Sequence, residues 1–239
     1  MKALALATTG LALAAALSLS GAALAQTAQT NYPSMAPVGQ YLMASRQDEI
    51  ALARSAAPPS ISAQATVLVM GPRGYESAAT GTNGWVCFVE RSWAAGFDDA
   101  DFWNPKSRGP NCFNPIAVRT ELPRVLKRTE WVLAGISKAQ MIDRTKAAVA
   151  DGTFKAPEPG ALSYMLSKNG YLNNADGPWL PHLMFFVTSG QAATWGAGKD
   201  GSPLIDAGGN DLDTIIFLVP VRRWSDGSAG PQPSPPHKM

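Results

Sequence analysis

Both cysteines of the chain, Cys87 and Cys112, lie within residues 81–115, a stretch that also holds three of the seven tryptophans. Glycines and prolines interrupt the segment between them, so secondary structure alone would not fix its shape. A disulfide that closes a loop of this length stabilises a fold by on the order of 3 kcal/mol in the chain-entropy model. We therefore predict a Cys87–Cys112 disulfide that holds this Trp-, Asp- and Asn-rich loop against the domain, in an oxidising compartment.

The first 25 residues predict export to such a compartment. They contain Lys2, an apolar run centred on residues 11–17, and Ala23-Leu24-Ala25, which is the build of a cleaved secretory signal. The alternative is a membrane anchor, but the apolar run is short and is interrupted by polar residues. We expect a signal peptide over 1–25 and a periplasmic or secreted protein. No cysteine lies near the cleavage site, so we expect no lipid anchor, and no later segment predicts a transmembrane anchor.

The remaining chain divides into three parts by composition. Residues 26–38 are polar and predict a flexible leader, whereas residues 225–239 are rich in proline and predict a disordered tail. Residues 39–224 contain no linker and no internal repeat, which predicts a single domain. The 20 Lys and Arg residues nearly balance the 18 Asp and Glu residues. This balance favours no partnership with nucleic acid.

Short apolar runs rich in Val, Ile and Phe predict the strands of a sheet. Turn signals at 71–74 and 81–84 divide residues 65–90 into three short segments, so this region predicts a three-stranded meander. Two further strands are predicted at residues 183–187 and 214–221. Residues 161–166 are a candidate for another strand.

Capping signals predict about three helices. One follows Ser45, a second begins at Asn114-Pro115, and a third begins at Ser137 with Gln140 in a capping box. Pro123 should kink or split the second helix. Arg124 and Arg128 lie in that helix, and we expect them on a solvated face. The order of the elements predicts an α+β fold with a mostly antiparallel sheet.

The loop between the cysteines combines aromatic and polar side chains, and such surfaces suit sugar rings, peptides or other small ligands. The same residue types also serve as loop anchors in a protein core. Our leading interpretation is a binding module for a small molecule, glycan or peptide. The predicted ligand-binding residues are Glu90, Arg91, Trp93, Asp98, Trp103 and Asn104.

Two other functions compete with ligand binding, and the residues leave open whether the protein is an enzyme. His182 with Glu90 or Asp98 could act in a hydrolase, provided that the side chains converge within about 3 Å of one another or of a shared water. A histidine at a strand entrance is more often a hydrogen-bonded structural residue. The second alternative is an envelope-associated structural protein, which would expose a large apolar patch.

The sequence predicts no metal and no cofactor. Asp98, Asp99, Asp101 and Asn104 carry oxygen atoms that could bind calcium, but they lack the spacing of the known calcium loop, and a solvated acidic turn is favoured. Two cysteines and His182 are too few for a zinc site. A catalytic thiol would depend on the same histidine as its base.

Long motifs of the chain resemble a group of exported bacterial proteins that carry no assigned activity. The motifs are GTNGWVCFVERSW, FWNPKSRGPNCFNP, SKAQMIDRTKAAVADGTFKAPEPGALSYMLS and PHLMFF. The resemblance covers most of residues 60–225. It implies a bacterial origin and one exported domain, and it brings no catalytic residues.

Overall fold

The computed structural model describes residues 32–209 and 213–231. The predicted signal peptide, residues 1–25, lies outside the described residues, as do positions 26–31 of the predicted leader and 232–239 of the predicted tail. Within the described ranges, no helix has the length and apolarity needed to cross a bilayer.

One eight-stranded sheet with the order β2-β1-β3-β4-β5-β6-β8-β7 runs through the protein. All neighbouring strands pair antiparallel except β1 and β3, which are parallel. The prediction of an α+β fold with a mostly antiparallel sheet is therefore confirmed. The strands are β1 Thr66–Gly71, β2 Gly74–Ala79, β3 Val86–Glu90, β4 Gly109–Phe113, β5 Leu162–Met165, β6 His182–Thr188, β7 Ile205–Asp206 and β8 Thr214–Pro220.

The predicted meander over residues 65–90 is wrong in its topology. Strands β1 and β2 form the expected hairpin, but β3 crosses back and pairs with β1 instead of β2. The half-exposed β2 is thereby left at the sheet edge, while the almost fully buried β3 takes an interior position. The crossing brings Gly81 against the backbone of Gln64 and Ala65, where a Cβ atom would lie 2.3 Å from the nearest backbone atom.

The helices are more numerous than the three predicted. The expected helices correspond to α1, to α3 with α4, and to α5. Pro123 lies in the first turn of α4. The helix is interrupted at Glu121, between α3 and α4, as the position of Pro123 predicted. The α-helices are α1 Arg46–Arg54, α2 Pro59–Ser62, α3 Pro115–Thr120, α4 Leu122–Leu133, α5 Lys138–Ala150 and α6 Ala192–Trp195, and the 3-10 helices are η1 Val38–Tyr41, η2 Ser92–Ala94 and η3 Ser189–Gln191.

Side-chain caps explain where the principal helices begin. The side chain of Ser45 accepts a hydrogen bond from the Asp48 amide, and that of Asn114 accepts one from the Ala117 amide. Ser137 and Gln140 form the reciprocal capping box that the sequence predicted. These bonds satisfy amide groups that the first helical turn leaves without partners.

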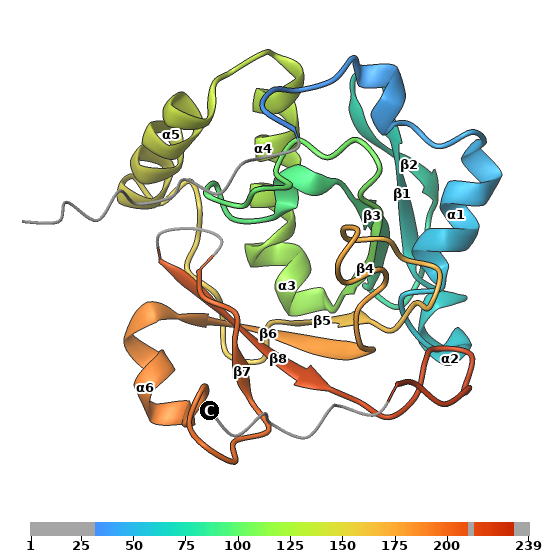
Figure 1. Ribbon diagram of the computed structural model, residues 1–239, viewed down its shortest axis with the longest axis vertical. Helices are drawn as coiled ribbons and strands as arrows, with labels where there is room; N and C mark the ends of the chain where they lie inside the picture. Colours follow the sequence, from blue (N-terminus) through green and yellow to red (C-terminus); the bar gives the residue numbers. More distant parts are fainter. Residues whose placement is uncertain (1–31, 210–212, 232–239) are drawn as a thin grey trace, which may run out of the picture.

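The helices cover both faces of the twisted sheet. Helix α1 packs on one face, over the cluster that contains Ala53, Val67 and Val89, while α3 and α4 pack on the other, over Phe88 and Phe113. Figure 1 shows the twist: β1 and β3 run upright in this view, whereas β5, β6 and β8 run across it. A third cluster lies beyond the end of β3, where the β3–β4 loop meets η1, α4 and α5.

The predicted disulfide between Cys87 and Cys112 is present. The two residues oppose each other directly in the β3–β4 ladder, and neither sulfur-bearing side chain is exposed. The disulfide therefore joins β3 to β4 inside the core. The loop that connects these two strands, residues 91–108, is enclosed by this bond. Strand β4, which contains Cys112, was not predicted, because it is short and contains Gly109 and Pro110.

Candidate functional site

Three of the six predicted ligand-binding residues belong to the protein interior. Arg91 and Trp93 are each 2% exposed, and Asn104 is 1% exposed. The Arg91 guanidinium pairs with Glu49 at 2.8 Å and also donates to the Tyr41 and Val89 carbonyls. Each of these contacts stabilises the fold, so the polar atoms of Arg91 are engaged within the protein.

The aromatic side chains of the β3–β4 loop pack inward. Trp93 donates from Nε1 to the Thr129 hydroxyl at 3.0 Å, and its ring lies 4.9 Å from that of Tyr41. Trp103 is half-buried and contacts the fully buried Phe102 edge-on. The loop aromatics therefore belong to a core cluster, in which Trp93 and Phe102 are buried and Phe97 and Trp103 are partly buried, and Trp93 also lines the inner cavity described below.

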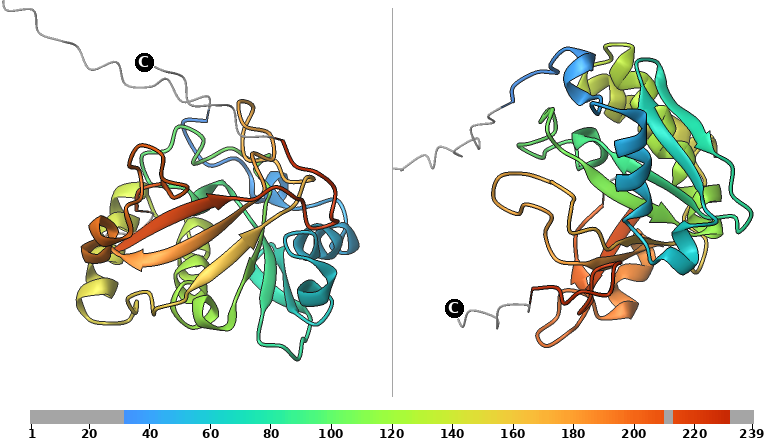
Figure 2. Two further views of the ribbon diagram at one scale, coloured as in Figure 1. Left: turned by 90° about the horizontal axis from the view of Figure 1, so that it is seen from below. Right: turned by 90° about the vertical axis from the view of Figure 1, so that its right-hand side faces the viewer.

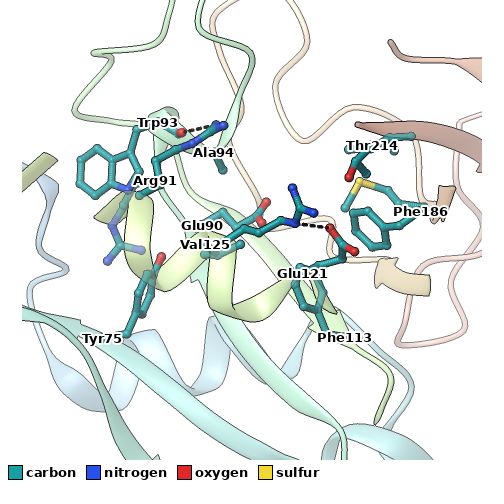
Figure 3. A pocket seen from close by; sticks show the side chains of 14 residues that line it. Tyr75, Glu90, Arg91, Trp93, Ala94, Phe113, Glu121, Val125, Phe186 and Thr214 are labelled. Carbon is teal, nitrogen blue, oxygen red and sulfur yellow. Dashed lines mark hydrogen bonds and ion pairs between the residues drawn. The ribbon is translucent and has the colours of Figure 1, made fainter. Parts of the chain in front are cut away.

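Glu90 lies where two cavities adjoin. The inner cavity, of about 80 Å³, lies between the sheet and α4, and the outer groove, of about 290 Å³, lies between the 91–108 loop and the β5–β6 loop. Glu90, Arg91 and Ala94 line both. In Figure 3, Glu90 lies among the side chains that line the inner cavity, with Val125 and Glu121 nearby.

Helix α4 and its N-terminal flank supply the other charged groups of the inner cavity. Arg124 donates two hydrogen bonds to Asp213, at 2.9 and 3.1 Å, and its Nε lies 3.8 Å from a Glu121 oxygen. Arg128 donates to the Trp93 carbonyl at 3.1 Å and lies over the Phe97 ring. Dashed lines in Figure 3 end at Glu121 and Trp93, which contact Arg124 and Arg128 respectively.

The expectation that Arg124 and Arg128 lie on a solvated face is wrong, because they are only 4% and 6% exposed. Glu121, Arg124 and Arg128 follow one another at spacings of three and four, so they share one face of a helix. This face also carries Val125, which lines the same cavity. The helical spacing of these charged residues with an apolar residue was the signal in the sequence that could have indicated a buried charged face.

Burial raises the pKa of Glu90 from its usual value of 4.5 to about 7, because the interior disfavours the charged carboxylate. The nearby Asn111 amide and the Arg128 charge oppose this shift. Glu90 keeps some exposed area, and that area faces the cavities. Among the described residues, no Lys, Arg or His forms an ion pair with it. The carboxyl group can therefore donate or accept a proton near neutral pH.

The outer groove has an acidic rim. Asp99 and Asp101 come from the 91–108 loop, and Asp176 comes from the β5–β6 loop, residues 166–181. Backbone hydrogen bonds of 2.6 and 2.9 Å between Arg108 and Tyr171 join these loops, which project to the same side in Figure 2. Partial burial raises the pKa of Asp101, and repulsion from Asp99 and Asp176 adds to the shift.

The structure does not bring His182 and Glu90 together. They lie on β6 and β3, with β4 and β5 between them, which corresponds to roughly 14 Å at the usual strand spacing. The His182 ring is 97% buried, its Nδ1 lies 2.7 Å from the Leu180 carbonyl oxygen, and burial lowers its pKa to about 4. Asp98 is exposed on the loop and lines neither cavity. His182, Glu90 and Asp98 therefore do not converge as the hydrolase interpretation requires.

An envelope-associated structural protein would expose a large apolar patch, but few large hydrophobic side chains are exposed among the described residues. The exposed large hydrophobic residues are Trp195 and Ile205, which lie on α6 and β7 away from the Glu90 cavities. Within residues 32–209 and 213–231, no three His, Cys, Asp or Glu side chains are grouped so that they could hold a metal ion.

Comparison of the chain with protein-family models, curated proteins and solved structures found no match. The resemblance to exported bacterial proteins stays a prediction, and the geometry around Glu90 provides the basis for assigning a function.

Proposed function

We propose that this protein binds a small molecule in the inner cavity and outer groove that meet at Glu90. The observation that carries the proposal is the position of this carboxyl group, which lines both spaces and has no ion-pair partner among the described residues. A buried titratable group in a cavity is typical of ligand and catalytic sites.

The form of the site favours a compact ligand over a glycan or a long peptide. The two spaces measure about 80 and 290 Å³, which suits a molecule of a few to about twenty heavy atoms. Trp93 and Phe102, which could have stacked on sugar rings, are buried in the third core cluster. The exported location that the sequence predicts would give such a protein access to solutes outside the cytoplasm.

A fragment screen followed by ¹H–¹⁵N NMR tests the proposal. We expect fragments whose chemical-shift changes concentrate at the backbone amides of Ala94, Gly109 and Val125, which line the two spaces. Ala94→Phe would fill the junction and abolish these changes. Ala100→Phe, at an exposed position of the same loop, is the matched control and should leave them intact. Fragments that bind only at other surfaces, or equally to both variants, would refute the proposal.

Acid–base catalysis by Glu90 is the second candidate function, and the pKa of about 7 favours it. In this form the reaction depends on Glu90 without His182. Hydrolysis of a compact ester or amide that Glu90→Gln abolishes and His182→Gln preserves would support catalysis. Turnover that persists in Glu90→Gln would exclude it.

A further inference from the structure

The outer groove has a strongly one-sided charge. Glu90 forms its inner end, while Asp99, Asp101 and Asp176 stand on its rim. Asp99 and Asp101 come from one loop and Asp176 from another, and the tertiary fold holds them together even though like charges repel. Such an arrangement costs free energy unless a positive charge compensates it.

The cations close to the groove make their ion pairs and hydrogen bonds with other groups, although the Lys138 charge also acts on Asp99. Arg91 pairs with Glu49 inside the core. The Arg108 guanidinium donates to the carbonyls of Pro105 and Ser107 within its own loop, and Lys138 donates to the Phe97 carbonyl at 2.9 Å. In the described part of the chain, no ion pair reaches any of the three rim carboxylates.

Ser92 is an independent sign of a ligand. It lines the groove and is 7% exposed, and its buried hydroxyl oxygen has no hydrogen-bond partner among the described residues. A buried hydroxyl without a partner is costly, and a ligand N–H group that reaches it from the groove would satisfy it. Met165 and Leu172 supply apolar surface in the same groove.

We propose that the outer groove binds a small organic cation, namely an aliphatic amine or guanidine. This inference rests on the proposed function and names the ligand class of the same site. The charged group lies between Asp101 and Asp176, and the carbon chain contacts Met165 and Leu172. An inorganic ion is disfavoured because the described carboxylates are spread along the groove and do not group as metal ligands.

NMR titrations with four probes of similar length test the ligand class. They are n-pentylamine, n-butylguanidine, 1-pentanol and pentanoate, each measured at pH 8 and low ionic strength. We expect both cations to bind in the groove at least tenfold more tightly than the alcohol and the carboxylate, with an affinity that falls as salt is added.

Two double variants with the same change in net charge locate the site. Asp101→Asn with Asp176→Asn should weaken binding of both cations by roughly five- to tenfold, as two partly exposed charge contacts are lost. Asp143→Asn with Asp200→Asn, at exposed positions outside the groove, is the control and should leave the affinity within about twofold.

The outcomes separate this inference from the proposed function. Preferential binding of 1-pentanol or pentanoate in the groove would overturn the cation assignment and leave small-molecule binding standing. Equal affinities in the two double variants, or no binding of either cation, would also overturn it. The fragment screen, which includes molecules of every charge, decides separately whether the site binds any ligand.

Discussion

Replacing Glu90 with glutamine would remove a carboxyl group whose ionisation the protein interior opposes. Burial raises the pKa of this group from 4.5 to about 7. Because the folded pKa is the higher one, the folded state holds the proton more tightly, and the free energy of unfolding falls as pH rises from about 4.5 to 7. A difference of 2.5 pKa units (7 − 4.5) at 1.36 kcal/mol per unit corresponds to about 3 kcal/mol lost above pH 7.

Urea unfolding of the wild type and of Glu90→Gln at pH 5 and pH 8.5 measures this loss. Glutamine has nearly the shape of glutamic acid and carries no charge, so the variant escapes the penalty at high pH. We expect the stability of Glu90→Gln relative to the wild type to rise by about 2 to 3 kcal/mol between the two pH values. Other titrating groups change both proteins alike and cancel in the difference.

The matched control is Glu130→Gln, an exposed position on α4 that pairs with Lys127 at the surface. Its effect should stay below about 1 kcal/mol at both pH values. A difference between wild type and Glu90→Gln that is the same at pH 5 and pH 8.5 would refute the argument. It would mean that water reaches Glu90 freely and that burial does not raise its pKa.

Substitutions in the disulfide, in the buried ion pair and in one helix cap test the framework of the fold through urea unfolding. Cys87→Ala with Cys112→Ala should lower the free energy of unfolding by about 3 kcal/mol, and an unchanged value would show that the bond adds nothing to the strand pairing. Glu49→Gln leaves the buried Arg91 charge without its partner and should cost about 3 to 5 kcal/mol, whereas a loss below about 1 kcal/mol would contradict the buried ion pair. Ser137→Ala removes the α5 cap and should cost about 1 kcal/mol, and Ser137→Asn should restore most of it.

Local signals in the sequence predicted much of the framework. The caps at Ser45, Asn114 and Ser137 located three helix starts, because a capping side chain bonds to an amide only two or three residues away. The apolar runs located the long strands β6 and β8. In contrast, β4 was missed and the β1–β3 pairing was misread, because strand partners are chosen by contacts between distant segments.

The candidate site was predicted only in part. Glu90 was named from the sequence, and the structure places it at the junction of the two cavities. Arg91 and Trp93 were named with it, yet their polar atoms contact Glu49 and Thr129 inside the core. A residue type shows which contacts a side chain can make, and the fold determines whether protein or solvent supplies the partner.

The sequence alone determined the principal helices, which depend on neighbouring residues, the α+β class, which follows from the order of the elements, and the cysteine pair, because the chain has only two cysteines. Tertiary structure decided which charged groups became buried. It placed Arg124 beside Asp213, set Asp101 near Asp176, and left His182 several strands away from Glu90. These relations join segments far apart in the chain, and local propensity carries no information about them. The pKa of Glu90 follows from the same packing, since desolvation depends on all the atoms that surround a group.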